Sequence, residues 1–544
     1  MRGWARGHVP SALFLLRCKQ KFCKMEKTDF LILGSGIAGC SAALVAAEAG
    51  LDVTIVTKGP SLTECTATAW AQGGIIYKGE NDSPDLLAQD IYRAGAEIGH
   101  MPAIRHLATR GPEYVEEILI KKLGVRFDRT PNDMLDTTEE GAHSVRRIIH
   151  VADLTGKAIE ERLVEEVLAK PNVRVISNAT ALDLLTISHH SLRPNDAYEP
   201  PTCVGAYIFL QKEGRVETLL ARETLLATGG LGQLFLHTTN PKGARGDGIA
   251  MAYRAGARLL NLEYVQFHPT ALYHGDGERF LISESVRGEG GVLIRRTGES
   301  FMEKYHPLGS LAPRDVVARA IHTEMLENQE PCVYLDITMK DADWIRRRFP
   351  NIYAKCLSVG IDMTKQPIPV VPAAHYSCGG VAVDLEGRTS IRRLRAAGEV
   401  SCTGVHGANR LASTSLLEGL VWGVDSARSI AREISQNGRE SYYFPTIEPW
   451  RYENEPVDPA LIFQDWLTIK YTMWNYVGLI RTTKRMKRAR SILRELQTEI
   501  EYFYERARLS DEIIGLRNGC QAALAVLFAA LENRRSYGAH YRVD

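Results

Sequence analysis

The segment DFLILGSGIAGCSAALVAAEAGLDVTIVTKG, residues 29–59, restricts the fold of this chain more than any other part of it. It predicts a short buried strand over 31–33, a glycine turn, an apolar helix and a second strand over 53–56. The turn carries the pattern G-x-G-x-x-G at Gly34, Gly36 and Gly39. These glycines permit the tight turn, close backbone approach to a pyrophosphate and close helix–strand packing, and the helix N-terminus favours phosphate. The segment therefore predicts an α/β, Rossmann-like, dinucleotide-binding fold.

Two later features bear on which dinucleotide binds. The second strand ends in Thr57 and Lys58 instead of the acidic residue that usually meets a ribose hydroxyl, and a lysine there can pair with a phosphate. A later predicted strand, ETLLATGGLG (223–232), ends in a second glycine-rich crossing that contains Thr228 and Gly229. Such a second crossing is typical of two-domain flavoproteins and predicts FAD.

Asp247 begins a predicted helix within GARGDGIAMAYRAGA, residues 243–257, where the helix dipole favours a carboxylate. Two interpretations stay open for this residue. It contacts the dinucleotide, or it is a plain helix cap.

Composition excludes several classes of protein. The 544 residues suffice for two or three domains, and a formal net charge of +1 provides no overall field that favours nucleic acid or a membrane. The ten cysteines show neither a C-x-x-C pair nor metal-ligand spacing, which predicts no metal site and a reduced, cytoplasmic setting. No uninterrupted apolar run reaches about 18 residues, so we expect a soluble protein.

The N-terminal 25 residues are strongly basic. They contain no acidic side chain and six basic ones, namely Arg2, Arg6, Arg17, Lys19, Lys21 and Lys24. Two interpretations stay open: a transit peptide that targets an organelle, or a start of translation at Met25.

From Asp29 to the C-terminus the sequence resembles the succinate dehydrogenase/fumarate reductase flavoprotein family. Eight ordered blocks carry the resemblance: TAWAQGGI (68–75), GAHSVRRIIHVADLTG (141–156), GDGIAMAYRAGA (246–257), QFHPTALY (266–273), SESVRGEGG (283–291), LAPRDVVARAI (311–321), AAHYSCGGV (373–381) and GEVSCTGVHGANRLASTSLLEGLVWG (398–423). The resemblance implies a discontinuous Rossmann-like FAD-binding domain (26–261 and 377–446), an inserted α+β capping domain (262–376) and a C-terminal helical bundle (447–544).

Within this family, three blocks resemble the branch that oxidises L-aspartate. Succinate dehydrogenases typically read H-Y-x-M-G-G, G-R-D and N-R-L-G-G-N-S-L where this chain reads HYSCGG, APRD and NRLASTSLLE. The branch implies FAD-dependent oxidation of L-aspartate to iminoaspartate, with dioxygen or fumarate as the final oxidant, as the first step of quinolinate and NAD biosynthesis. It further implies quinolinate synthase as a partner, and neither nucleic acid nor a membrane subunit. A soluble fumarate reductase is the alternative enzyme.

The resemblance also implies how FAD is held. The histidine to which the dehydrogenases link their flavin corresponds here to Ala67, so we expect one non-covalent FAD per chain. The expected FAD-binding residues are Gly34, Ser35, Gly36, Ile37, Ala38, Gly39, Lys58, Ala67, Thr68, Ala69, Trp70, Ala71, Gln72, Gly73, Gly74, Ala181, Leu182, Thr228, Gly229, Asp247, Glu399, Ser415 and Leu416. Ser415 and Leu416 are expected to start a helix whose N-terminus faces the flavin.

A dicarboxylate needs two carboxylate clamps, and the planar fork of arginine suits them. Arg410 and Arg314 are the candidates, and His268, Thr270 and His375 can donate further hydrogen bonds. The resemblance assigns His375 to a substrate carboxylate. A metal site or a Cys378 nucleophile in PAAHYSCGGV (372–381) is the competing interpretation, although a metal would need more ligands.

Arg314 resembles the proton-transferring arginine of the family. An arginine is a poor acid in water, so a relay is expected behind it. Glu284 and Arg287 are spaced i,i+3 and can share one helix face. The other interpretation of this pair is a structural ion pair.

Glu140 matches a glutamate that the resemblance places near the substrate ammonium, where a carboxylate discriminates against succinate. The neighbouring Glu139 leaves the register open by one position, and an ordinary surface acid is the alternative.

Outside the blocks, residues 186–202 are polar and contain proline, which predicts a surface loop between strands. A helical stripe in the C-terminal part comprises Met486, Ala489, Leu493, Leu496 and Ile500. The basic run RTTKRMKRAR (481–490) on the same segment is interpreted as a solvated helix face, with an RNA- or protein-binding surface as the alternative.

Overall fold

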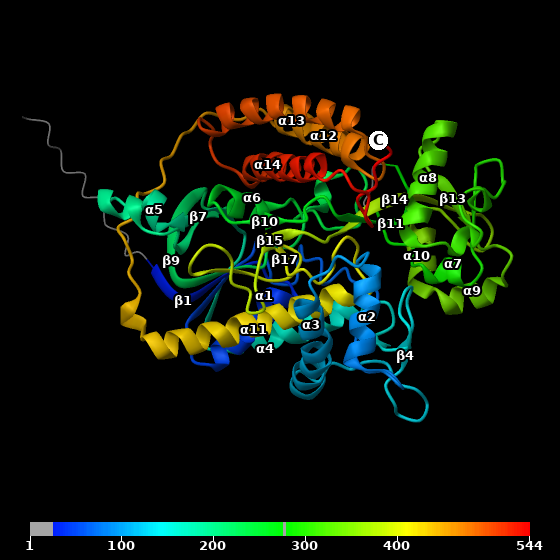
Figure 1. The fold of residues 1–544 in the computed structure, drawn as a ribbon, viewed down its shortest axis with the longest axis horizontal. Helices are drawn as coiled ribbons and strands as arrows, with labels where there is room; N and C mark the ends of the chain where they lie inside the picture. The colour runs from blue at the N-terminus through cyan, green and yellow to red at the C-terminus, as the bar shows by residue number, and fades with distance from the viewer. Residues whose placement is uncertain (1–25, 276–278) are drawn as a thin grey trace, which may run out of the picture.

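The predicted strand–turn–helix–strand unit lies at the centre of the largest sheet of the protein (Figure 1). The computed structural model describes residues 26–275 and 279–544. The two interpretations of residues 1–25 therefore concern a part of the chain outside the described residues. The expected second strand over 53–56 is confirmed, and the first strand is longer than expected because it begins at Glu26.

Seven strands form the largest sheet: β6 (Val173–Ile176), β2 (Val53–Val56), β1 (Glu26–Leu33), β9 (Arg215–Leu226), β8 (Cys203–Leu210), β7 (Ala179–Thr186) and, also beside β9, β16 (Leu394–Ala396). The strands β6, β2, β1 and β9 run parallel, as a Rossmann-like fold requires. The strands β8 and β7 extend the sheet in antiparallel fashion.

Strand β9 connects early and late parts of the chain. One of its edges pairs with β1, while the other pairs with β8 over residues 215–220 and with β16 over residues 224–226. Thus residues 394–396 return to the sheet formed by the N-terminal part. This return is what a discontinuous nucleotide-binding domain requires.

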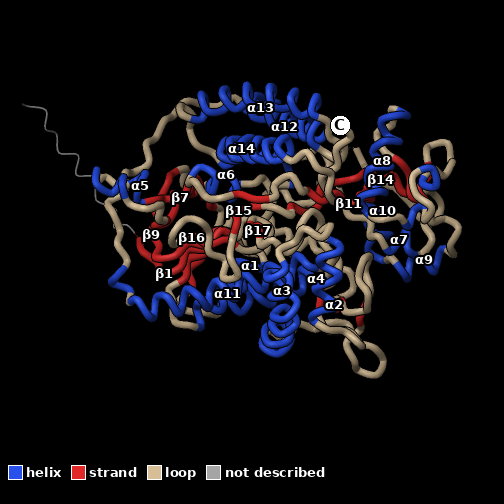
Figure 2. The backbone as a smooth tube through the Cα atoms, viewed as in Figure 1, coloured by secondary structure: helices blue, strands red, loops and turns tan. Residues whose placement is uncertain are grey.

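Helices cover both faces of this sheet, as Figures 1 and 2 show. On one side lie α1 (Ile37–Glu48), α2 (Pro84–Ala94), α3 (Met101–Tyr114), which a π-helical segment continues over Val115–Lys122, α4 (Thr155–Leu168) and α11 (Thr414–Asn437). On the other side lie α6 (Asp247–Arg254) and the C-terminal bundle of α12 (Pro459–Val477), α13 (Thr483–Tyr504) and α14 (Asp511–Glu532). Small side chains such as Ala42, Ala43 and Ala46 let α1 pack closely between the sheet and α11.

A second body lies at one end of the molecule (Figure 1). Its sheet has the order β11-β14-β13-β12, with β11 (Val265–Leu272), β14 (Ile368–Ser377), β13 (Val333–Asp336) and β12 (Val292–Ile294). Its helices are α7 (Ser285–Gly288), α8 (Arg314–Asn328), α9 (Ala342–Arg348) and α10 (Pro350–Ser358). The α+β character of residues 262–376 agrees with the expected capping domain.

Two small sheets connect these bodies. One has the order β3-β5-β4, with β3 (Ile75–Ile76), β5 (Ile148–Ile149) and β4 (Thr137–Thr138). The other has the order β10-β15-β17, with β10 (Leu259–Leu260), β15 (Gly380–Ala382) and β17 (Ser401–Cys402). Residues 186–202 connect β7 to β8 as predicted, but they also form α5 (Ile187–His190) and a 3₁₀ turn over Pro194–Tyr198.

The predicted apolar stripe of the C-terminal bundle is confirmed, because Met486, Ala489, Leu493 and Ile500 of α13 are buried and Leu496 is partly buried. The interpretation of the basic run as a solvated face is wrong for its first residue. Arg481 is fully buried, and its guanidinium donates to the backbone oxygen of Glu263 at 2.7 Å. Helix period alone did not reveal this, since Arg481 precedes the helix.

One described helix, α14, is long and apolar enough by length and composition to cross a membrane. Inside this protein, however, 72% of its apolar window is buried. Its apolarity is therefore explained by its position as the inner helix of the bundle.

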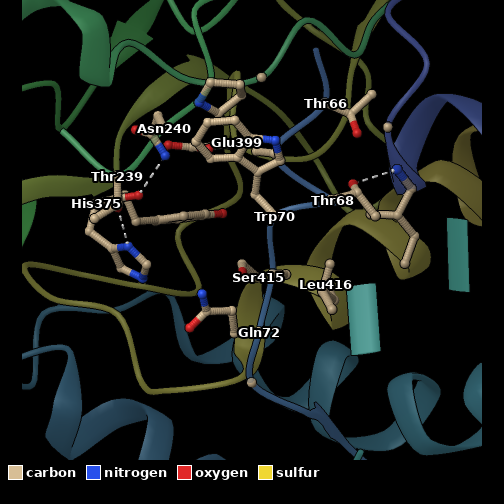
Figure 3. A pocket seen from close by; sticks show the side chains of 18 of the residues that line it. Thr66, Thr68, Trp70, Gln72, Thr239, Asn240, His375, Glu399, Ser415 and Leu416 are labelled. Carbon is tan, nitrogen blue, oxygen red and sulfur yellow. Dashed lines mark hydrogen bonds between the residues drawn. The ribbon is translucent and has the colours of Figure 1, made fainter. Parts of the chain in front are cut away.

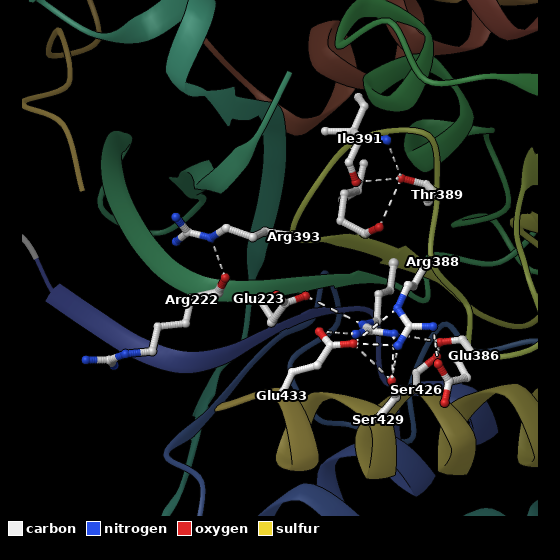
Figure 4. Close-up of polar contacts among 12 residues, drawn as sticks. Arg222, Glu223, Glu386, Arg388, Thr389, Ile391, Arg393, Ser426, Ser429 and Glu433 are labelled. Carbon is white, nitrogen blue, oxygen red and sulfur yellow. Dashed lines mark hydrogen bonds and ion pairs between the residues drawn. The ribbon is translucent and has the colours of Figure 1, made fainter. Parts of the chain in front are cut away.

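A polar network ties β9 and β16 to α11 beneath the sheet (Figure 4). The buried Arg395 donates to Glu433 at 2.8 Å and lies 3.5 Å from Glu223. Burial raises the pKa of Glu223 to about 7, and Arg395 opposes this rise. The network fixes α11 against the strands, and α11 in turn carries residues of the site described next.

Candidate active site

A cavity of about 900 Å³ extends between the largest sheet and the second body. Its walls come from the β1–α1 turn, the loop 64–74, the strand ends after β9 and β16, and the start of α11. The second body contributes α7, the start of α8 and residues 347–350. Most of the predicted site residues line this one cavity, although they come from distant parts of the sequence.

The glycine turn forms one end of the cavity. Gly34 has φ 114°, and a Cβ there would lie 2.1 Å from the carbonyl oxygen of Ala227, so the crossing of β1 and β9 excludes any larger residue. Helix α1 begins at Ile37 without a capping side chain on Gly36, and the Ile37 N–H donates to Thr68 Oγ1 at 3.0 Å. The turn thus offers an open helix N-terminus, which suits a phosphate.

Lys58 and Asp247 lie beside this turn. Lys58 Nζ donates to Asp247 Oδ2 at 2.5 Å and to the backbone oxygen of Gly243 at 2.8 Å. Burial alone would raise the pKa of Asp247, but Arg245 and Lys58 hold it below its usual range. The helix α6 is capped by Gly246, and Asp247 makes no capping hydrogen bond. The plain-cap interpretation of Asp247 is therefore wrong.

The loop 64–74 forms a side wall (Figure 3). Thr66 Oγ1 donates to Glu160 Oε2 of α4 at 2.9 Å, and burial raises the pKa of Glu160 to about 8. A Cβ at Gly156, in the first turn of α4, would lie 1.9 Å from the backbone oxygen of Thr68. The loop is therefore held closely against α4.

The wall opposite the loop comes from segments after β9 and β16. Glu399 lines the cavity and accepts a hydrogen bond from the Ser377 N–H at 2.9 Å (Figure 3). Burial raises the pKa of Glu399 to about 7. Helix α11 begins at Thr414, one residue before the expected start, and its N-terminus also lies at the cavity with no capping side chain. Two open helix N-termini and a glycine-lined wall fit an extended, phosphate-bearing FAD.

Arg410 lies at the other end of the cavity. Its guanidinium carbon is 4.8 Å from the centre of the Tyr376 ring, and its hydrogen bonds to Leu411 and Ser415 are long, at 3.4 and 3.5 Å. Its Nε has no hydrogen-bond partner, and within 26–275 and 279–544 no acidic side chain forms an ion pair with it. A buried cation in this state is prepared to receive a carboxylate.

Two histidines lie close together at this end, with ring centres 5.6 Å apart. His268 Nδ1 accepts from the Thr270 N–H at 3.2 Å, which leaves the proton on Nε2. His375 Nδ1 lies 2.8 Å from Thr239 Oγ1 (Figure 3). Burial, followed by neighbouring charged groups, lowers the pKa of both histidines well below the usual value, so both imidazoles are neutral near pH 7.

Arg314 is the first residue of α8, and its Nε donates to Glu284 Oε2. On the far side, Arg287 Nη2 lies 3.6 Å from Glu284 Oε1. Burial would raise the pKa of Glu284, but Arg314 and Arg287 lower it below the usual value. The three groups form a continuous chain from the cavity to the buried Arg287, as the predicted relay requires.

Glu140 lies between the two ends of the cavity. Its Oε2 accepts a hydrogen bond from Ser413 Oγ at 2.8 Å, and its Oε1 would be 3.0 Å from a Cβ on Gly73. Glu140 is half-buried, whereas Glu139 is exposed, although both line the cavity. The geometry favours Glu140 over Glu139 as the acid that faces a substrate.

Five predicted site residues do not line the cavity: Gly39, Ala69, Leu182, Thr270 and Arg287. Gly39 packs against Gly34, which is the expected role of a third glycine. The Thr270 hydroxyl is fully buried and donates to the Ile282 oxygen at 2.9 Å, so the hydrogen bond expected from it to substrate is not available. Arg287 is fully buried behind Glu284.

The sequence reasoning missed three polar residues of the cavity. Thr239 contacts the His375 ring, Asn240 Nδ2 donates to the His375 backbone oxygen at 3.0 Å, and Ser413 contacts Glu140. The polar run TTN before PKG was a signal for the first two. Ser413 has φ 56°, a strained conformation for a residue with a Cβ, which no sequence pattern shows.

The competing interpretations of residues 372–381 find no support. Cys378 is buried, and burial raises the pKa of its thiol, so it is a poor nucleophile. Within the described residues no group of three or more His, Cys, Asp or Glu side chains is arranged to hold a metal ion. All eight described cysteines are free thiols.

Two family models match the chain and together cover most of it. The model described as the FAD binding domain matches residues 29–416. The model described as fumarate reductase flavoprotein C-term matches residues 467–544.

Several curated relatives match nearly the full chain. L-aspartate oxidase of Yersinia pestis is 43% identical over 522 residues, which is 95% of this chain and 96% of that protein. L-aspartate oxidase of Pseudomonas aeruginosa is 41% identical over 526 residues, which is 95% of each chain. The chloroplastic L-aspartate oxidase 2-b of Nicotiana tabacum is 39% identical over 95% of this chain and 81% of that protein.

Solved structures agree with the fold. The FrdA chain of E. coli quinol fumarate reductase matches with a TM-score of 0.83 and 26% identity, over 96% of this chain and 92% of that one. Mycobacterium smegmatis Sdh1 in complex with UQ1 matches with a TM-score of 0.81 and 29% identity, over 95% of this chain and 89% of that one. The chain therefore belongs to the succinate dehydrogenase/fumarate reductase flavoprotein family, and within it to the L-aspartate oxidases.

Proposed function

We propose that this protein is a FAD-dependent enzyme that oxidises L-aspartate to iminoaspartate. The observation that carries the proposal is the charge pattern at one end of the cavity. Arg314 and Glu140 both lie close enough to Arg410 to act on its pKa, which burial lowers and Glu140 raises. Two cations and one acid complement the two carboxylates and one ammonium of aspartate.

Each residue has a distinct task in the proposed reaction. Arg410, supported by the Tyr376 ring, binds one carboxylate, and neutral His375 donates a further hydrogen bond to it. Neutral His268 and Arg314 hold the other carboxylate, while Glu140 pairs with the ammonium. Arg314 also moves a proton, with Glu284 and Arg287 behind it to keep the pair in place.

FAD, when bound, accepts a hydride from the substrate Cα and passes the electrons to dioxygen or fumarate. The residues proposed to hold it are those of the glycine turn, the loop 67–74, Lys58, Ala181, Thr228, Gly229, Asp247, Glu399, Ser415 and Leu416, all of which line the cavity except Ala69. Ala67, at the position of the linking histidine, has no atom that can bond to a flavin, which supports non-covalent binding.

The domain arrangement is part of the proposal. Residues 26–261 and 377–446 form the FAD-binding domain, 262–376 cap the substrate and 447–544 form the helical domain. The end of β14 at Ser377 and the presence of Arg314 in the cavity wall support these boundaries. A cap that carries Arg314 can exclude water from the bound substrate.

In the cell, the product would enter quinolinate and NAD biosynthesis. We propose a cytoplasmic enzyme with quinolinate synthase as the partner that consumes iminoaspartate. The support is the identity to bacterial proteins named L-aspartate oxidase over nearly the whole chain.

The experiment that tests the function is a steady-state assay with dioxygen. L-aspartate should drive oxygen consumption with one hydrogen peroxide formed per oxygen, while succinate, which lacks the ammonium that Glu140 would pair with, should drive none. Oxygen consumption with succinate at a comparable rate would contradict amine recognition.

A further inference from the structure

The C-terminal bundle touches the FAD end of the cavity directly. The two residues that come from it are Asp511, the first residue of α14, and Asn518, two turns further along. Both are engaged with side chains around Asp247 and not with other members of the bundle. Figure 1 shows α14 beside α6, the helix that Asp247 begins.

Asn518 holds the Asp247 carboxylate from behind. Its Nδ2 donates to Asp247 Oδ1 at 2.9 Å, while Lys58 Nζ holds Oδ2 at 2.5 Å. Asn518 is itself fixed, because its Oδ1 accepts from Arg254 Nη1 at 2.9 Å. With 1% of its surface exposed, Asn518 has no solvent to replace these bonds. The orientation of Asp247 therefore depends on a residue of the C-terminal bundle.

Asp511 holds the neighbouring cation. It pairs with both terminal nitrogens of Arg245, at 2.7 and 2.9 Å, and its Oδ1 also accepts from Thr180, a residue of the cavity wall. The surface of α14 fits closely around this guanidinium, since a Cβ on Gly515 would lie 2.5 Å from Arg245 Cζ. Arg245 in turn lies 3.3 Å from Asp247 Oδ2.

We propose that α14 is a functional part of the FAD site, in which Asn518 and Asp511 are positioning residues that hold Asp247 and Arg245 in the geometry that binds FAD. The C-terminal helical domain thus contributes to cofactor retention. This inference rests on the assignment of Asp247 to FAD in the proposed function. It does not depend on which substrate is oxidised.

The test uses Asn518→Asp in the full-length holoenzyme. This change keeps the shape of the side chain but places a carboxylate against Asp247 in place of a donor. The FAD dissociation constant, measured from the free FAD fluorescence on serial dilution, should rise about 10-fold or more, the value of one hydrogen bond to a charged group. The loss should shrink as the pH is lowered, because one carboxyl of a close pair then takes a proton and again acts as a donor. Lys58, Arg245, Arg254 and Asp511 are the other charged groups that face this pair.

Gln521→Glu is the matched control. Gln521 lies on the same helix, contacts the same Arg254 at 2.6 Å and donates to Glu501, but it does not contact Asp247. The control should change FAD affinity less than about threefold and without the pH effect. Equal FAD affinities of the two variants would overturn the inference.

Two further variants cover the remaining outcomes. If Asn518→Asp does not fold, Asn518→Ser removes the donor without adding charge and should still weaken FAD binding more than Gln521→Ser does. Asp247→Asn tests the assignment on which the inference rests. Unchanged FAD affinity in Asp247→Asn would overturn both that assignment and the role of α14, and would leave aspartate oxidation untouched.

Discussion

Arg314→Ala should lower turnover with L-aspartate by about 1,000-fold or more while FAD stays bound. The substitution removes a carboxylate ligand and the cavity end of the chain formed by Arg314, Glu284 and Arg287. Fumarate reduction should fall equally, because the proposed proton transfer serves both directions. The turnover number and the flavin content per chain, measured on the same preparation, check this prediction.

Arg319→Ala is the matched control for this prediction. Arg319 lies on the same helix, forms an ion pair with Asp315 at 2.8 Å and does not line the cavity. Its removal should leave turnover within a fewfold of the unchanged protein. Loss of FAD from Arg314→Ala, or near-normal turnover in it, would show that Arg314 has a structural role only.

Glu140→Gln should separate the two reactions of the proposed enzyme. Aspartate oxidation should fall about 10- to 100-fold, since the substitution replaces a carboxylate that pairs with an ammonium by a neutral amide. Fumarate has no ammonium, so fumarate reduction by the chemically reduced enzyme should change only a fewfold. The amide keeps an oxygen for the Ser413 hydroxyl, so the local structure should be preserved.

Glu139→Gln decides the register that the sequence left open. Glu139 is exposed and also lines the cavity, so it is the fair comparison for Glu140. It should behave like the unchanged protein in both reactions. A selective loss of aspartate oxidation in Glu139→Gln would move amine recognition to that residue, and equal losses of both reactions in Glu140→Gln would remove the argument for it.

The part of the site that could be predicted from sequence is the part encoded by local motifs. The glycine turn was predictable because Gly34 is required by a backbone crossing, and the pair Glu284 and Arg287 because i,i+3 spacing lets both side chains meet. Both signals depend on residues close together in the chain. The resemblance to a known family then supplied Arg314, His375 and Arg410.

What sequence could not predict depends on long-range contacts. Thr270 resembles a cavity donor, yet its hydroxyl is committed to Ile282, and Arg481 resembles a surface cation, yet it is buried against Glu263. Asn518 contacts Asp247 across 271 positions of sequence, and no local pattern marks it. In each case the deciding partner belongs to another element.

The measurement that tests the central claim most directly is an anaerobic mixing experiment. The purified protein is mixed with L-aspartate or with succinate, and the visible flavin absorbance is followed. Bleaching by L-aspartate and not by succinate is the predicted result, because Glu140 has an ammonium to pair with only in aspartate. Absence of bleaching by L-aspartate, in a protein whose chemically reduced flavin is still reoxidised by fumarate, would contradict the account and identify a fumarate reductase.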